Sequence, residues 1–183
     1  NRDFINTMEP SIDILISSNL ERLLYLKSKD TNLIKELMSS LKTNKKYTIP
    51  NSILTSIQED FVGIYASEEE VKEAIKEVYE KDHYLIDPHT AVAYIASKKY
   101  DTKHKKVILA TASPYKFSKD VYKCLTNEDI VDNLEAIETL ENCTNIEAPS
   151  NLKELKDLPL RFREVFNLSD KDLLIKKLEK NND

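Results

Sequence analysis

The chain of 183 residues contains one glycine, no tryptophan and two cysteines, and the scarcity of glycine and of cysteine excludes classes of site. A chain of this length would contain about 13 glycines at average usage. Loops that cradle phosphate groups need close backbone approach and positive φ, which glycine supplies. Because Gly63 is the only glycine, the sequence contains neither a Walker phosphate-binding loop nor a dinucleotide-binding fingerprint.

Cysteine spacing and apolar runs exclude two further classes. Cys124 and Cys143 have no Cys-x-x-Cys or Cys/His companion, so we expect reduced, partly buried thiols and no metal site. No apolar run approaches the ~20 residues of a membrane span, and the start does not resemble a signal peptide. We therefore expect a cytoplasmic protein without a membrane partner. Because Asn1 is not a methionine, we also expect a piece of a longer gene product.

The charge balance argues against nucleic acid as a partner. Lysine and arginine total 27 against 32 aspartates and glutamates, which gives a net charge of −5, and no basic face is concentrated enough for a nucleic-acid footprint. An apolar content of 40% and a length of 183 residues suffice for one domain with a core and a trailing lobe.

Helical periodicity and capping signals predict a helix-rich chain. Asp30 is placed to cap one helix, Ser67 and Glu70 form a capping box for another, and Asp87 followed by Pro88 starts a third. Short helices are expected between 127 and 183. The longer predicted helices cover residues 10–26, 31–41, 50–57, 67–79, 87–99, 113–125 and 170–178.

Two apolar runs predict strands, at about 61–65 and 107–111. The second is wholly apolar from 107 to 110, which is typical of an internal strand, and Gly63 within the first suggests close backbone approach. The predicted fold class is therefore α/β with few strands and many helices.

Thr111 lies at the carboxyl end of the second predicted strand and just before a helix N-terminus, where α/β enzymes place cofactors. Its hydroxyl could satisfy a nearby backbone group, or it could bond to a heteroatom of a bound ring. Lys116, in the first turn of the following helix, opposes the helix dipole, so it is either an anion-binding ammonium or a solvated lysine. His89 is either a capping or packing histidine or a catalytic one.

Three segments together resemble threonine synthase, the pyridoxal-phosphate enzyme that converts O-phosphohomoserine and water to threonine and phosphate. Their order and spacing are similar to those of its C-terminal part. The segments are NTM at 6–8 with PSIDILISSNLERL at 10–23, DPHTAVAY at 87–94, and TASPYKF at 111–117. The resemblance implies the helix-rich C-terminal portion of a pyridoxal-phosphate enzyme of fold type II, with the end of the catalytic domain at 1–126 and a helical tail at 127–183.

The resemblance also implies roles for individual residues. Thr111 matches the threonine that bonds to the pyridine nitrogen of the cofactor, and Ser113 departs from the histidine that many relatives have at its position. Asn19 and Lys116 are candidates for contacting the substrate or attracting its phosphate, Lys116 on charge and position alone. No lysine here matches the one that forms the Schiff base.

The family's Ser-Phe-Lys-Asp segment and its phosphate loop have no counterpart in this chain. We therefore expect the isolated chain to be inactive and not to retain pyridoxal phosphate, and we expect the missing N-terminal part of the same polypeptide to be its partner. The alternative is a non-catalytic helical interaction or regulatory module. An upstream Ser-Phe-Lys-Asp lysine in the same reading frame would distinguish the enzyme from the module.

Overall fold

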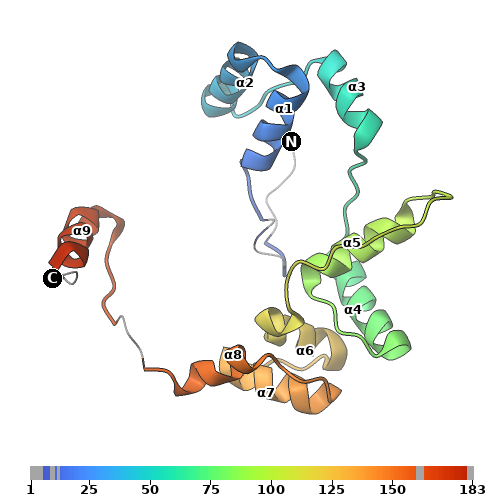
Figure 1. The fold of residues 1–183 in the computed structure, drawn as a ribbon, viewed down its shortest axis with the longest axis vertical. Coiled ribbons are helices and arrows are strands. Elements are labelled where there is room, and N and C mark those ends of the chain that lie inside the picture. Colours follow the sequence, from blue (N-terminus) through green and yellow to red (C-terminus); the bar gives the residue numbers. More distant parts are fainter. Residues whose placement is uncertain (1–5, 9–10, 12, 160–162, 181–183) are drawn as a thin grey trace.

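A computed structural model describes residues 6–8, 11, 13–159 and 163–180, and its regular elements in these ranges are all helical. The helices form two groups with separate apolar clusters, followed by a C-terminal helix that stands apart (Figure 1). This arrangement agrees with the predicted helix-rich C-terminal portion of a larger enzyme fold.

The first group consists of α1 (Ser18–Ser28), α2 (Thr31–Asn44) and α3 (Asn51–Asp60). Its buried core is small, because only three apolar side chains, Leu24, Leu37 and Ile53, are buried between the helices. The Asp30 carboxylate accepts hydrogen bonds from the first backbone N–H groups of α2, which confirms the predicted cap.

The predicted start of the first helix is wrong. α1 begins at Ser18, where the Ser17 hydroxyl accepts a hydrogen bond of 3.2 Å from the backbone N–H of Leu20. Residues 13–17 are irregular, and the side chains at 14–16 are exposed. The Ser17 cap therefore defines the start of α1. Pro10, at the predicted start, lies outside the described residues.

The second group is larger and has the main core. Its elements are α4 (Glu68–Asp82), α5 (Pro88–Lys99), η1 (Pro114–Phe117), α6 (Ser118–Thr126), α7 (Asn133–Thr144), α8 (Ser150–Lys153) and η2 (Glu154–Asp157). The capping box of Ser67 and Glu70 is present at α4, as predicted. α6 packs against α4 and α7, and its Val121 is fully buried with Ile75 of α4 and Leu140 of α7.

The two predicted strands are irregular segments in the structure. Residues 61–65 and 107–111 have no strand assignment, and most of their apolar side chains are exposed. A strand exists only when a neighbouring strand takes up its backbone N–H and C=O groups. No such neighbour lies in the described part of the chain, so apolar composition alone does not produce strands here.

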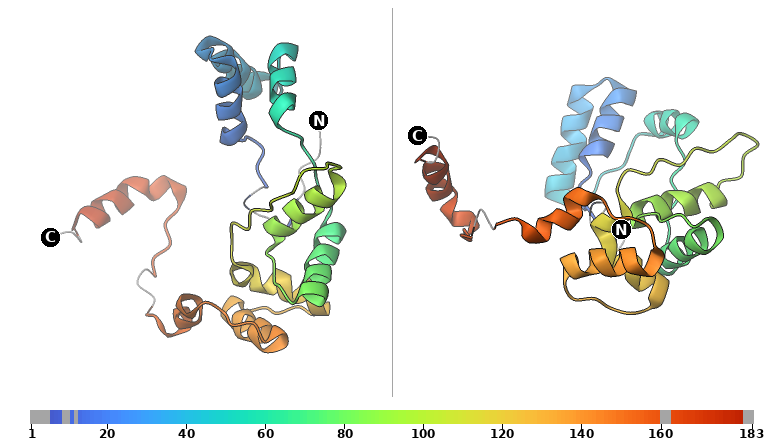
Figure 2. Two further views of the ribbon diagram at one scale, coloured as in Figure 1. Left: turned by 45° about the vertical axis from the view of Figure 1, so that its right-hand side comes forward. Right: turned by 60° about the horizontal axis from the view of Figure 1, so that its bottom comes forward.

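The C-terminal helix, α9 (Lys171–Lys180), follows the short η3 (Leu168–Asp170). It begins one residue after the predicted start at 170, and both views in Figure 2 show it away from the α4–α8 group. None of the described helices combines the length and the apolar character that crossing a lipid bilayer requires.

Candidate functional site

The buried carboxylate of Asp87 organises the first turn of α5. Its Oδ1 accepts a hydrogen bond of 3.0 Å from the backbone N–H of His89, and its Oδ2 accepts one from the hydroxyl of Thr90. The Asp87 side chain is completely buried, and a buried carboxylate needs such donors because its desolvation is costly. The predicted start of this helix at Asp87 and Pro88 is confirmed.

His89 connects three parts of the chain. Its Nδ1 lies 3.1 Å from Asp87 Oδ1, its Nε2 is hydrogen-bonded to the Ser11 hydroxyl, and its ring centroid is 5.0 Å from that of Phe117. An ionised carboxylate only accepts, so Nδ1 carries the proton and, in the neutral ring, Nε2 accepts from Ser11. These contacts are those of a packing histidine. The contact with Ser11 could not be predicted from the sequence around either residue.

The N-terminal segment folds back onto the second helix group. Asp13 accepts hydrogen bonds from the backbone N–H and the hydroxyl of Thr7, at 2.7 and 2.8 Å. The backbone N–H of Met8 donates to Glu68 of α4 at 3.3 Å, and the Met8 sulfur lies 3.8 Å from the buried Cys124 thiol of α6. Met8 is therefore held beside the start of α4 and beside Cys124 in the second half of α6.

A tight turn precedes α6. The Ser113 hydroxyl accepts a hydrogen bond of 3.3 Å from the backbone N–H of Tyr115, and the Tyr115 hydroxyl donates to the carbonyl of Ile146. Burial raises the pKa of the Tyr115 hydroxyl, so it remains a donor at neutral pH. The exposed Lys116 ammonium lies 5.7 Å from the centroid of the Phe117 ring.

The three residues predicted to contact cofactor or substrate are all exposed. Thr111 lies in the irregular segment before Ser113, Lys116 lies in η1, and Asn19 lies on α1, where it accepts a hydrogen bond from Arg22. No hydrogen bond joins any two of the three within the described residues. Thr111 and Lys116 share the turn before α6, whereas Asn19 belongs to the other helix group.

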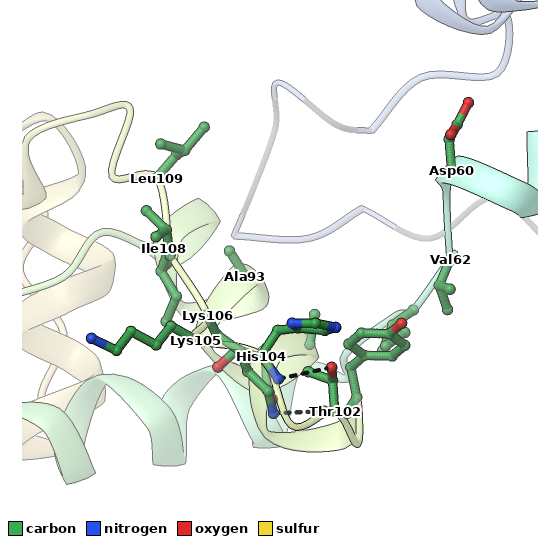
Figure 3. A pocket seen from close by; sticks show the side chains of 14 residues that line it. Asp60, Val62, Ala93, Thr102, His104, Lys105, Lys106, Ile108 and Leu109 are labelled. Carbon is green, nitrogen blue, oxygen red and sulfur yellow. Dashed lines mark hydrogen bonds between the residues drawn. The ribbon is translucent and has the colours of Figure 1, made fainter.

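A hollow of about 610 Å³ separates the two apolar segments. Figure 3 shows Val62 on one side and Ile108 and Leu109 on the other, with Ala93 of α5 between them. Val107 is 83% exposed and Leu109 is 74% exposed. The hollow is bounded at one end by the turn from 102 to 106, where the backbone N–H of His104 donates to the Thr102 hydroxyl at 3.3 Å.

The Lys106 ammonium fixes the base of this turn to α5. It donates hydrogen bonds to the backbone carbonyls of Ser97 and Tyr100, at the C-terminal end of the helix. Cations are favourable at a helix C-terminus, where carbonyl groups lack intrahelical partners. The segment that leads to Thr111 therefore leaves α5 in a defined direction, although it has no strand partner in the described part of the chain.

Comparisons with known proteins agree with the sequence resemblance. Residues 90–174 match the family model described as threonine synthase, C-terminal. The chain is 37% identical over 131 residues to threonine synthase-like 1 of Homo sapiens, covering 70% of this chain and 18% of that protein. It is also 37% identical over 139 residues to threonine synthase of Saccharomyces cerevisiae, covering 66% of this chain and 27% of that protein.

Two solved structures share the fold. Yeast threonine synthase superposes with a TM-score of 0.77 at 29% identity, covering 98% of this chain and 37% of that one. Threonine synthase of Brucella melitensis with bound pyridoxal phosphate superposes with a TM-score of 0.63 at 33% identity, covering 75% and 30%. The chain thus spans well under half the length of these relatives. Its sequence and fold match the C-terminal region of those threonine synthases.

Proposed function

We propose that this chain is the C-terminal portion of a pyridoxal-phosphate-dependent threonine synthase, which converts O-phosphohomoserine and water to threonine and phosphate. The likeness to yeast threonine synthase over 98% of the chain carries the proposal, because it extends over both helix groups. The likeness to a threonine synthase with bound pyridoxal phosphate supports the cofactor. When bound, pyridoxal phosphate supplies the electron sink for such a reaction.

Thr111 is the proposed cofactor contact. Its side chain is exposed, and its hydroxyl has no hydrogen-bond partner among the described residues, so it is free to bond to a pyridine nitrogen. A hydroxyl is neutral at physiological pH and cannot hold that nitrogen protonated as a carboxylate would. Thr111 would thus orient the ring while moderating its electron withdrawal. The Ser113 cap and the buried Tyr115 hold the turn that presents Thr111.

Asn19 and Lys116 are the proposed substrate contacts. The Lys116 ammonium forms no ion pair with a described carboxylate, so its charge is available to the phosphate group of the substrate. The Asn19 amide is exposed on the first turn of α1. Its NH2 group offers donors to the amino acid moiety, while its side-chain oxygen accepts a hydrogen bond from Arg22.

The upstream part of the same polypeptide is the proposed partner of the hollow between 61–65 and 107–111. Exposed apolar side chains line both sides, and the backbone of both segments lacks strand partners in the described part of the chain. The relatives extend well beyond the matched region, since the chain covers 27% of the yeast protein. An apolar strand from the remaining portion would complete a sheet here and bury these side chains.

The activity is tested by comparing the full-length protein with the 183-residue chain. With pyridoxal phosphate, the full-length protein should release phosphate from O-phosphohomoserine and form threonine in equal amounts. The isolated chain should release none and should not retain the cofactor, which is followed by its absorbance after gel filtration. Turnover by the isolated chain would overturn its assignment as one part of the catalytic unit.

The role of Thr111 is tested by Thr111→Val in the full-length protein, which removes the hydroxyl and keeps the side-chain shape. We expect weaker cofactor binding, by roughly tenfold, because one hydrogen bond of about 1 kcal/mol is lost and an unpaired ring nitrogen is left. The cofactor absorbance spectrum should also shift. The matched control is Thr55→Val, at an exposed position of α3. Unchanged affinity and spectrum would remove Thr111 from the site.

A further inference from the structure

The hydroxyl of Ser118 is a buried polar group without a hydrogen-bond partner among the described residues. Four polar residues are buried among those described, and three of them are hydrogen-bonded: Asp87 and Thr90 to each other, and Thr144 to the carbonyl of Leu140 at 2.7 Å. Ser118 is only 5% exposed, and no hydrogen bond to its side chain exists within the described residues. Buried hydroxyl groups are normally paired, so an unpaired one indicates a missing ligand or water.

Ser118 lines a hollow of about 450 Å³ between the start of α6 and the two helices that cover it. The α7 helix contributes Asn133 and Leu134, and the segment from α8 to η2 contributes Leu152 and Leu155. The volume exceeds the ~30 Å³ share of a single water, so the hollow can accommodate a small ligand.

The start of α6 attracts negative charge to this hollow. Ser118 is the first residue of α6, and the preceding Phe117 has no side-chain acceptor that could cap the helix. η1 runs directly into α6, and the positive end of the α6 dipole lies at Ser118, which lines the hollow. Anions bind readily at such helix ends.

The charged side chains that line the hollow have a net positive sum. Lys116 and Lys119 contribute two positive charges and Asp120 contributes one negative charge, which leaves one net positive charge. The Lys119 ammonium donates to the carbonyl of Val131 at 2.8 Å, which holds it beside the hollow. The exposed Lys116 can turn towards a ligand, since its contact in the structure is with the Phe117 ring.

We propose that this hollow binds a phosphate group, with the Ser118 hydroxyl and the first turn of α6 as hydrogen-bond donors and Lys116 as the counter-charge. A phosphate group supplies several acceptor oxygens, which match a hydroxyl, backbone N–H groups and an ammonium. Binding would satisfy the unpaired hydroxyl. The proposal rests on the proposed function for Lys116, which is also the proposed contact of the substrate phosphate, whereas Ser118 and the packing of α6, α7 and α8 are independent of that assignment.

The test is titration of the 183-residue chain with inorganic phosphate, at ionic strength matched with sodium chloride. Binding is followed by calorimetry and by NMR shifts of the backbone amides at 118–120. We expect saturable shifts at these amides and a rise in melting temperature with phosphate. Ser118→Ala and Lys116→Gln should each weaken binding by roughly tenfold, since each removes a hydrogen bond to a charged group.

Asp120→Asn has the opposite expected effect. It removes the negative charge from the hollow, so phosphate affinity should rise severalfold. The matched control is Lys123→Gln on the same helix, where the lysine pairs with Asp129 and lies outside the hollow. This variant should bind phosphate like the parent chain.

Parallel titrations identify the source of the phosphate group. Free phosphate as occupant predicts equal affinity for inorganic phosphate and O-phosphohomoserine, whereas a phosphomonoester occupant predicts tighter binding of O-phosphohomoserine or of pyridoxal phosphate. Each result, with the losses in Ser118→Ala and Lys116→Gln, supports the site. Absence of shifts at 118–120 with all three compounds would show that the hollow holds only water. Equal binding by Ser118→Ala would show that the hydroxyl takes no part in binding. Either result would overturn the proposal.

Discussion

The core between α4, α6 and α7 and the apolar segments at 61–65 and 107–111 contain similar side chains in opposite environments. Ile75 and Leu140 are fully buried, whereas Val107 and Leu109 are largely exposed. The core residues find partners on helices nearby in this chain. The two segments have no such partner among the described residues. The difference separates a part of the chain that is packed by its own contacts from a part that stays exposed in the described structure.

The largest expected effect is in the buried core. Leu140→Ala should lower the free energy of unfolding by about 2–5 kcal/mol, because it removes buried methyl groups and leaves a cavity. Leu109→Ala is the matched control and should change it by about 0.5 kcal/mol or less in the isolated chain, because the side chain is already exposed. Urea unfolding followed by circular dichroism measures both. Equal losses would contradict the comparison.

The buried cap of α5 should give the next largest effect. Asp87→Ala leaves the His89 ring, its backbone N–H and the Thr90 hydroxyl without their acceptor, so we expect a loss of about 2–3 kcal/mol. Asp30→Ala removes the exposed cap of α2 and should cost about 1 kcal/mol. Thermal and urea unfolding of the two variants compare a buried with an exposed cap. A smaller loss for Asp87→Ala than for Asp30→Ala would be inconsistent with the burial of Asp87.

The capping box at α4 provides a smaller effect within the same core. Ser67→Ala should destabilise the chain by about 1 kcal/mol, because the backbone N–H of Glu70 loses its acceptor at the helix end. Amide hydrogen exchange at residues 68–71 should speed up at the same time. Ser56→Ala, at a helical serine of α3 with no cap to lose, is the control. Comparable losses in the two variants would contradict a specific capping role.

The smallest effect concerns Asp120 and depends on pH. Burial raises the pKa of its carboxyl above the ordinary value of 3.8, so the folded chain holds this proton more tightly than the unfolded chain. The resulting stabilisation is fully present below pH 3.8 and is lost as the pH rises through the raised pKa. In phosphate-free buffer, Asp120→Asn should therefore be slightly more stable than the parent at pH 7. The two chains should be equally stable near pH 3, and a constant difference across this range would refute the assignment.

Local signals predicted the helices well because each depends on residues close in sequence. Asp30, the pair of Ser67 and Glu70, and Asp87 before Pro88 mark helix starts through their own side chains. The start of α1 was missed because the apolar residues at 14–16 continue a helical pattern while Ser17 provides the cap.

Local sequence patterns could not predict the features that depend on residues distant in the sequence. The predicted strands need partners that the described residues do not supply, and the contact between Ser11 and His89 joins positions 78 residues apart. The sequence identified the turn before α6 as important, and the structure places Lys116 and Ser113 there with a fixed backbone. The roles of Thr111, Asn19 and Lys116 remain predictions. The sequence could not predict the unpaired hydroxyl of Ser118, because the burial of this serine depends on how α6, α7 and α8 pack.

The path of the chain before and after the α1–α3 group makes that group an insertion. Met8 already contacts α4 and α6 before the chain enters α1, and Ser67 caps α4 soon after the chain leaves α3. The two apolar clusters share no residue. A shortened chain in which a flexible linker joins residue 13 to residue 66 should therefore keep the larger core, because that core takes no side chain from the three helices.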